Sequence, residues 1–237
     1  MITIKDYTPY PITTLGERAG ECWGADTSDK KKNFLRGVEC INSDHGRTLE
    51  YPTIDFVLEG YSARVVREIY TNCVGVTKLQ QSTRYVNCEE FEYFTPPSIK
   101  NNNEALQVYE DEMKRIKVAY KTLVKSFNIP KEDAANILPL AMETKCAFKY
   151  NLRALSNMAA KRFCTRTYHE YRSFLNELKQ ECSKLDFEWK LLWDNVLIAQ
   201  CDRTGYCIEA RSCGKYPKAN KLLQVENYKN YIENEGK

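Results

Sequence analysis

Several short motifs that mark common enzyme classes are missing from this sequence of 237 residues. It contains neither the phosphate-binding loop G-x-x-x-x-G-K-[ST] nor the zinc motif H-E-x-x-H, and it lacks the glycine-rich fingerprint of a Rossmann domain. Only two histidines are present, His45 and His169, and no Ser–His–acid arrangement can be read from their spacing. Any dinucleotide would therefore be held by a different architecture.

The sequence also has little net charge and no long apolar run. Its formal charge is +3, from 35 basic and 32 acidic side chains, whereas a nucleic-acid-binding surface is usually more basic and clustered. No apolar stretch approaches the ~20 residues that span a bilayer, and the first residues lack the layout of a signal peptide. We therefore expect a cytoplasmic protein that binds neither nucleic acid nor membranes.

Closely paired cysteines are absent too, although the sequence has 10 cysteines. Most are scattered, as is usual for reduced thiols in a cytosolic protein. Cys201, Cys207 and Cys213 are evenly spaced as C-x5-C-x5-C and could hold zinc together with a fourth ligand. Because the usual C-x2-C pair is missing, we favour loop cysteines without a metal.

What the sequence does contain is a globular composition, with 43% hydrophobic and 12% aromatic residues, which suits a single domain over residues 1–237. Residue periodicity predicts the following elements. Strands are expected at 2–7, 53–58 and 144–150, short helices at 13–23, 33–41, 62–70 and 130–138, and long helices at 101–127 and 154–184.

The stretch from Tyr61 to Tyr85 concentrates the chemistry that a nucleotide needs. Four cations lie in it, together with the hydroxyls and amides of residues 77 and 80–83. The four cations are Arg64, Arg67, Lys78 and Arg84. Guanidinium groups donate two parallel hydrogen bonds to phosphate, and neutral side chains add directional bonds, which suits a phosphorylated heterocycle. The alternative is an amphipathic helix followed by a polar surface loop.

This stretch resembles the signature of the flavin-dependent thymidylate synthases (ThyX), R-H-R-x-x-S-x-x-x-x-S-x-R. Aligning Ser82-Thr83-Arg84 with its second half places Thr77 at the first serine and Asn72-Cys73-Val74 at the R-H-R. Arg64 matches the arginine that often precedes the R-H-R by eight positions.

Two other stretches resemble the same family. Residues 45–51, H-G-R-T-L-E-Y, are similar to H-x-S-x-x-E-H, and residues 132–139, E-D-A-A-N-I-L-P, are similar to E-x-A-R-x-V-L-P with Ala135 at the arginine. Further matches follow at Thr144, Asn151, Arg153, Asn157 and Arg162. The resemblance covers about residues 15–175, and we expect a cysteine-containing extension over about residues 185–237.

The resemblance implies an α+β fold, with a mixed or antiparallel sheet and long helices. It implies conversion of dUMP to dTMP, with FAD as cofactor and with NADPH and methylenetetrahydrofolate as co-substrates. It also implies a homotetramer whose active sites are shared between subunits. The implied dUMP contacts are Ile69, Asn72, Gln80, Gln81, Ser82, Arg84 and Arg162. The implied FAD contacts are His45, Arg47, Asn72, Cys73, Val74, Gln80, Asn151, Arg153 and Asn157.

Arg162 is the residue that the resemblance marks as catalytic, through a contact with the pyrimidine that promotes ionisation at N3. A guanidinium stays charged at any relevant pH, so it can stabilise an anionic base without titrating. If residues 154–184 form one helix, Arg162, Arg166 and His169 share a face. The alternative is a solvated basic face, and we give His169 no role.

The sequence also departs from the family at three cationic positions. The stretch Asn72-Cys73-Val74 lacks the two arginines of the R-H-R, and Ala135 removes another. Each lost charge-assisted bond to phosphate can cost about 1.5–3 kcal/mol. Two alternative hypotheses follow: a non-catalytic protein that binds a nucleotide, or an enzyme with altered chemistry on a pyrimidine nucleotide, such as hydroxymethylation.

Overall fold

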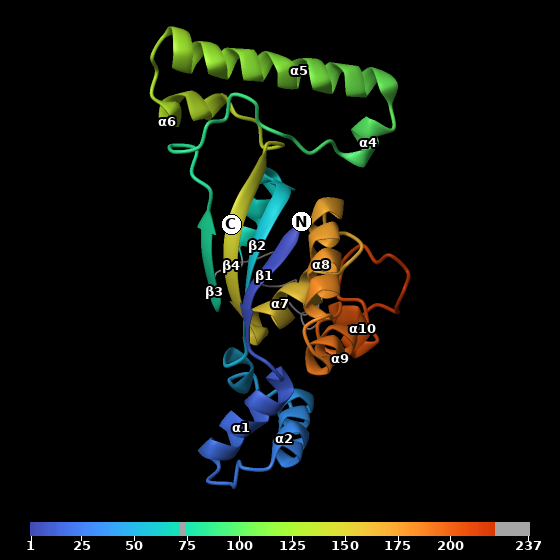
Figure 1. The fold of residues 1–237 in the computed structure, drawn as a ribbon. Helices are drawn as coiled ribbons and strands as arrows, with labels where there is room; N and C mark the ends of the chain where they lie inside the picture. The colour runs from blue at the N-terminus through green and yellow to red at the C-terminus, as the bar shows by residue number, and fades with distance from the viewer. Residues whose placement is uncertain (72–73, 221–237) are drawn as a thin grey trace, which may run out of the picture.

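The computed structural model describes residues 1–71 and 74–220. Its centre is a four-stranded sheet in the order β1-β2-β4-β3, in which every neighbouring pair is antiparallel (Figure 1). The strands are β1 (Ile2–Tyr7), β2 (Thr53–Ser62), β3 (Val76–Gln80) and β4 (Glu143–Asn151). The expected α+β class with an antiparallel sheet is confirmed.

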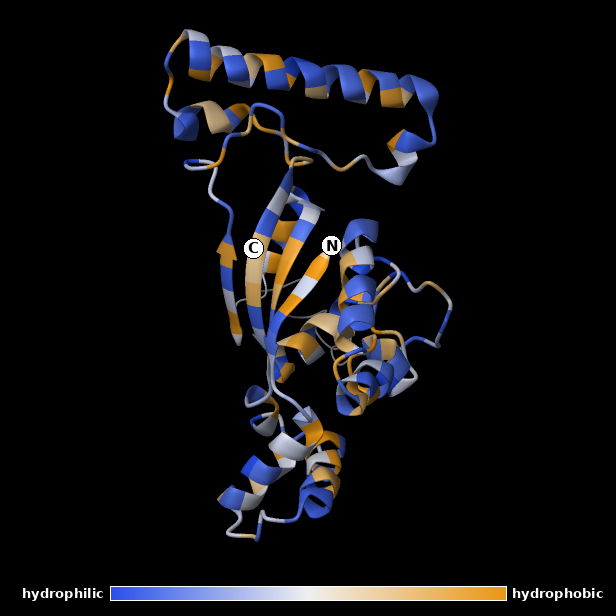
Figure 2. Ribbon diagram, in the orientation of Figure 1, coloured by the Kyte–Doolittle hydropathy of each residue, from blue (hydrophilic) through white to orange (hydrophobic). Residues whose placement is uncertain are grey.

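The two central strands bury alternate residues, as a half-buried sheet requires. Phe56 on β2 lies opposite Phe148 on β4, and both side chains are buried, whereas Val57 and Ala147 on the other face are partly exposed. Figure 2 shows the same alternation of hydrophobic and hydrophilic residues along these strands.

Four helices, one that follows β2 and three that follow β4, cover the buried face of the sheet. They are α3 (Ala63–Tyr70), α7 (Leu152–Arg162), α8 (His169–Cys182) and α9 (Phe187–Asn195). Phe56 contacts Phe148 and also Phe174 of α8, with ring centroids 5.6 and 6.1 Å apart. Such aromatic pairs add to the burial of apolar area, so this cluster is the main core of the protein.

A helical hairpin and an arm extend from opposite ends of the sheet (Figure 1). The hairpin consists of α1 (Pro11–Cys22) and α2 (Lys30–Asn42), and the 3-10 helix Thr48–Glu50 leads from it back to β2. The arm connects β3 to β4 and contains α4 (Pro97–Lys100), α5 (Asn103–Lys121) and α6 (Lys131–Ala134). It has a small core of its own, which includes Phe91, Met113 and Tyr120.

Two of the predicted helices are shorter than expected. The helix predicted at 101–127 is α5, which ends at Lys121 and passes into a π-helical turn, Thr122–Ser126. The helix predicted at 130–138 is the single turn α6, followed by the 3-10 helix Ala135–Ile137. Ile129 donates its N–H to the carbonyl of Leu123, which closes the chain back on itself after α5.

The prediction of one long helix at 154–184 is wrong, because the structure divides this segment into α7 and α8. Between them, Thr167 donates its N–H to Cys164 O at 3.0 Å, and its hydroxyl contacts Lys161 O at 3.4 Å. Threonine loses side-chain freedom in a helix and readily bonds to nearby backbone groups, so Thr165 and Thr167 favour a turn at this point.

The expected C-terminal extension begins inside the main core. Trp189 and Trp193 on α9 are fully buried, and α10 (Gln200–Thr204) follows. Neither helix is among the predicted elements, although the apolar spacing of Trp189, Leu192 and Trp193 is a signal for α9. No helix in the described ranges combines the length and apolarity needed to cross a membrane.

A buried carboxylate joins α8 to the point where β2 becomes α3. Glu170 Oε1 accepts the N–H of Ser62, and Glu170 Oε2 accepts the Ser62 hydroxyl, both at 2.6 Å. Ser62 in turn caps α3 by accepting the N–H of Val65 at 3.2 Å. Glu170 and Ser62 are 2% and 1% exposed, so water cannot replace these bonds without local unfolding.

Replacing Glu170 by alanine is expected to lower the free energy of unfolding by about 3 kcal/mol, because it leaves two buried donors without an acceptor. Glu170→Gln should lose less, since its amide oxygen still accepts one bond. Urea denaturation measures both, with Glu39→Ala on the exposed side of α2 as the control. A loss for Glu170→Ala no larger than the control would contradict this role.

Candidate functional site

The residues expected to contact flavin gather where β4 ends and α7 begins. Asn151 is the N-cap of α7, and its side-chain oxygen accepts the N–H of Ala154 at 2.8 Å. Its own N–H bonds to the carbonyl of Gly75 at 3.0 Å. The segment before β3, which includes Val74, therefore lies beside the start of α7.

The loop after α2 reaches the same place. Gly46 packs so closely on Arg153 that a Cβ atom there would lie 1.9 Å from Arg153 Nη1. Arg153 also pairs with Asp44 at 3.5 Å, across an exposed contact. His45 and Arg47 flank Gly46, and both are exposed to solvent. The structure therefore brings the stretch at 45–47 to Arg153.

Asn157 lies one helical turn after Arg153 on α7 and is exposed, so the two side chains share a face of this helix. One surface thus combines two guanidinium groups, an imidazole and amides. They belong to His45, Arg47, Asn151, Arg153 and Asn157. This chemistry fits a cofactor that carries both a diphosphate and planar rings.

The residues expected to contact dUMP lie toward the other end of β3. Gln80 is the last residue of this strand, and its amide contacts the Thr144 hydroxyl at 3.4 Å. Gln81 continues the pairing, with its N–H bonded to Lys145 O at 2.8 Å. The Ser82 hydroxyl then accepts the N–H of Arg84 at 3.3 Å, which shapes a turn after β3.

Arg84 is exposed and forms an ion pair with Glu132 of α6 at 2.5 Å. Ala135 follows Glu132 by three residues, so an arginine at that position would project near the same carboxylate. Both partners of the existing pair are about half exposed, which limits the stabilisation from it to about 0–1 kcal/mol. Arg84 can therefore exchange Glu132 for a phosphate at little cost.

Arg162 occupies a different part of the molecule, at the end of α7. Its guanidinium lies 4.0 Å from Glu68 of α3 and 5.0 Å from the ring centre of Tyr171 on α8. The side chains of Arg162 and Glu68 are each 31% exposed. Within the described part of the chain, Arg162 and Arg84 share no partner, so one chain holds the two arginines on separate elements.

Not every expected contact lies on the described surface of the protein. Ile69 is fully buried in the main core, which argues against a contact between its side chain and a nucleotide. Asn72 and Cys73 lie outside the described residues. Lys78, one of the four cations in the stretch from Tyr61 to Tyr85, donates to Tyr70 O, and its ammonium lies 4.5 Å from the Tyr70 ring centre.

Arg166 and His169 do not share a helix face with Arg162, contrary to the expectation, because the chain turns between α7 and α8. Arg166 pairs with Glu209 at 2.8 Å, away from α3. His169 begins α8 and packs against Phe94 and Tyr168, with ring centres 5.7 and 4.3 Å away.

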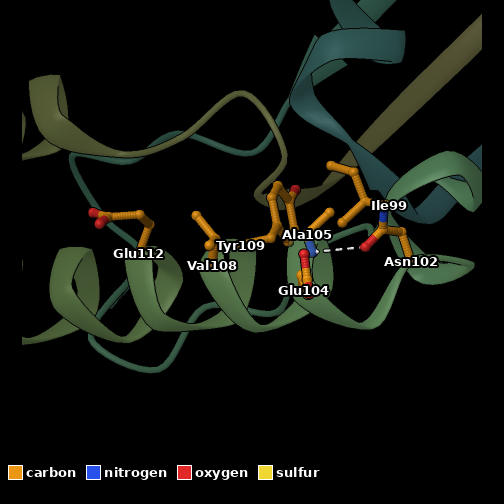
Figure 3. A pocket seen from close by; sticks show the side chains of 7 residues that line it. All are labelled: Ile99, Asn102, Glu104, Ala105, Val108, Tyr109 and Glu112. Atoms are coloured by element: carbon orange, nitrogen blue, oxygen red, sulfur yellow. Dashed lines mark hydrogen bonds between the residues drawn. The ribbon is translucent and has the colours of Figure 1, made fainter.

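Two surface pockets lie at the arm. An apolar groove of about 530 Å³ runs along α5 (Figure 3) and contains none of the expected site residues. It is lined by Ile99, Asn102, Glu104, Ala105, Val108, Tyr109 and Glu112. A second pocket of about 430 Å³ lies between α3, α8 and the arm, and Arg64 and His169 are among its lining residues. Arg64 stacks there on Tyr168 at 4.8 Å.

The candidate zinc cysteines do not form a metal site. No group of three or more His, Cys, Asp or Glu side chains that could hold a metal ion occurs in residues 1–71 and 74–220. Cys207 is buried and its N–H bonds to Pro217 O, whereas Cys213 is exposed. A hydrogen bond from the Lys215 backbone lowers the pKa of the Cys213 thiol.

Comparisons with known proteins identify the family of this chain. Residues 6–186 match the family described as Thy1, thymidylate synthase complementing protein. A flavin-dependent thymidylate synthase of Clostridium tetani is 26% identical, over 93% of this chain and 96% of its own. The corresponding protein of Thermococcus kodakarensis is 31% identical, over 88% of this chain and 89% of its own.

Solved structures show the same fold. The structure of ThyX from Helicobacter pylori with FAD and dUMP has a TM-score of 0.62 at 21% identity, and covers 83% of this chain and 99% of its own. The UMP/dUMP methylase PolB from Streptomyces cacaoi, bound with 5-Br dUMP, has a TM-score of 0.65 at 15% identity, with coverages of 84% and 96%.

The contact between Gly75 and Asn151 generates a prediction about stability. Gly75 has φ +74°, and a Cβ atom there would lie 2.5 Å from the Asn151 amide. Gly75→Ala should therefore lower the free energy of unfolding by about 1 kcal/mol through backbone strain, and by about 1 kcal/mol more because the Asn151 helix cap is displaced.

Gly24→Ala is the matched control, since Gly24 has φ +65° and a Cβ atom there would meet nothing within 4 Å. Gly24→Ala should lower the free energy of unfolding only by the part that comes from backbone strain. Thermal or urea unfolding of both variants measures the difference. Equal losses would show that the Asn151 cap does not depend on Gly75.

Proposed function

Because the chain belongs to the thymidylate synthase complementing protein family, we propose that it is a flavin-dependent thymidylate synthase that acts in the cytoplasm. The proposed reaction is the reductive methylation of dUMP to dTMP, with methylenetetrahydrofolate as the one-carbon donor and NADPH as the reductant. The observation that carries the proposal is the convergence of His45, Asn151 and Arg153, from distant parts of the chain, on one surface.

FAD would be held on this surface by the side chains around the start of α7. Arg153 and Arg47 supply positive charge for a diphosphate, and Asn157 supplies an amide on the same helix face as Arg153. When bound, the flavin supplies the transfer of reducing equivalents, and the protein supplies position and electrostatics.

The nucleotide would be bound by the turn after β3. Ser82 and Arg84 would hold the phosphate, with Arg84 leaving Glu132, and Gln80 and Gln81 would contact the rest of the nucleotide. Arg84 is the cation best placed for phosphate on this turn, since Lys78 bonds to the backbone of α3.

Arg162 would contact the pyrimidine and stabilise negative charge that develops on it at N3. Its guanidinium is only partly exposed, which strengthens its electrostatic effect relative to bulk water. Glu68 and Tyr171 hold it in place from two other helices. Aligning base and flavin in this way lowers the entropic part of the barrier.

A site shared between subunits would explain why Arg84 and Arg162 lie on separate elements within one chain. Arg84 depends on the arm through Glu132, and Arg162 depends on α3 and α8. We therefore propose a homotetramer in which one subunit contributes the phosphate contact and another the base contact. The exposed apolar residues of the arm, such as Val108 and Val118, are consistent with contacts between subunits.

Product analysis tests the proposed activity. The purified protein is incubated with FAD, NADPH, methylenetetrahydrofolate and radiolabelled dUMP, and the nucleotides are separated by chromatography. The proposal predicts dTMP that requires both flavin and folate. Recovery of unchanged dUMP that nevertheless binds the protein would favour the non-catalytic alternative, and a hydroxymethylated product would favour altered chemistry.

Arg84→Ala is expected to weaken dUMP binding by about 10- to 100-fold, because it removes a charge-assisted bond of about 1.5–3 kcal/mol. Arg115→Ala is the control, since Arg115 also pairs with a glutamate on the arm, Glu112, at 2.7 Å. Calorimetric titration with dUMP measures both. Equal affinities of the two variants would exclude Arg84 as the phosphate contact.

Complementation tests the shared site. Arg84→Ala and Arg162→Ala proteins should each lack activity, and co-expressed chains should recover part of it, because a mixed oligomer contains sites that keep both arginines. Each variant expressed alone is the control. If mixed oligomers form but remain inactive, both arginines act from the same chain.

A further inference from the structure

Trp23 is an exposed tryptophan next to the proposed flavin surface. Its side chain is 53% exposed, whereas Trp189 and Trp193 are fully buried in the main core. Tryptophan is enriched at interfaces, because its large ring can pack against a partner while its N–H keeps a polar contact, so the surroundings of Trp23 decide whether it faces a ligand.

The backbone of Trp23 is fixed because it caps α1. Its N–H contacts the carbonyls of Ala19 and Gly20, each at 3.1 Å. The indole meets the His45 ring edge to face, with centres 6.4 Å apart and an interplanar angle of 68°. This arrangement leaves much of the indole surface open to solvent.

The contacts continue from Trp23 to the start of α7. His45 adjoins Gly46, which packs on the guanidinium of Arg153. An indole, an imidazole and a guanidinium thus lie in sequence along one surface, from α1 to α7. Aromatic rings bind planar heterocycles by stacking, and a nearby guanidinium binds phosphate.

We propose that Trp23 contacts one of the two planar rings of FAD, isoalloxazine or adenine, and so extends the cofactor site onto α1. This inference rests on the proposed function, because it takes FAD as the ligand. It adds a residue that none of the family-like stretches contains. The exposure of a tryptophan at the end of an amphipathic helix is the structural signal for it.

Tryptophan fluorescence of the full-length wild-type protein gives the first test. Since the other two tryptophans are buried, iodide should quench mainly Trp23. Adding FAD should remove this iodide-sensitive emission and leave a protein that responds like Trp23→Phe. If Trp23 stays equally sensitive to iodide when FAD is bound, the proposal is overturned.

Affinity gives the second test. Trp23→Ala should weaken FAD binding about tenfold, Trp23→Phe should retain most of the affinity, and Phe127→Ala, an exposed aromatic at the end of the arm, should change nothing. Titrations with FMN, which carries isoalloxazine, and with ADP, which carries adenine, identify the ring that Trp23 contacts. Trp23→Ala should weaken the binding of only one of these two ligands.

The outcomes separate this inference from the proposed function. Wild-type affinity in Trp23→Ala overturns the role of Trp23 and leaves a flavin-dependent enzyme standing. A wild-type protein that does not bind FAD overturns both. Circular dichroism checks that each variant is folded.

Discussion

The Glu170 carboxylate holds the site-bearing elements of this protein in register. It binds the backbone and hydroxyl of Ser62, where β2 ends and α3 begins, so α8 and α3 are joined through a buried carboxylate, each oxygen of which accepts a bond from Ser62. Glu68 on α3 and Tyr171 on α8 then meet Arg162 from two sides. Because Tyr171 follows Glu170 directly, the interaction that fixes the helices also fixes the surroundings of the arginine.

The sheet separates the proposed chemistry into two regions. The proposed flavin surface lies where β4 passes into α7, and the turn proposed to bind phosphate lies at the other end of β3, next to the arm. The missing arginines fall in both regions: Val74 takes the place of one beside the flavin surface, and Ala135 takes the place of one beside Arg84. Each region therefore depends on few cations, chiefly Arg153 and Arg84. A single substitution at either should have a larger effect than in a relative that keeps the full signature.

The sequence was most informative where periodicity or motif spacing acted locally. The alternation in β2 and the helix that begins after Ser62 correspond to real elements. Two of the stretches that the resemblance assigns to FAD, at 45–47 and at Arg153, lie together in the structure, because Gly46 packs on Arg153. The break between α7 and α8 could not be predicted because it depends on weak local preferences of Thr165 and Thr167, reinforced by the distant pairing of Glu170 with Ser62. The buried position of Ile69 and the exposure of Trp23 are tertiary properties that no spacing rule contains.

The most direct measurement of the central claim is the visible absorption spectrum of the protein after incubation with FAD and dUMP and removal of free ligands by gel filtration. A flavin-dependent enzyme should retain flavin, and the flavin absorption should be lost when NADPH is added without oxygen, since the flavin carries the reducing equivalents. A colourless protein, with or without dUMP, would contradict the claim that this chain is a flavin-dependent enzyme.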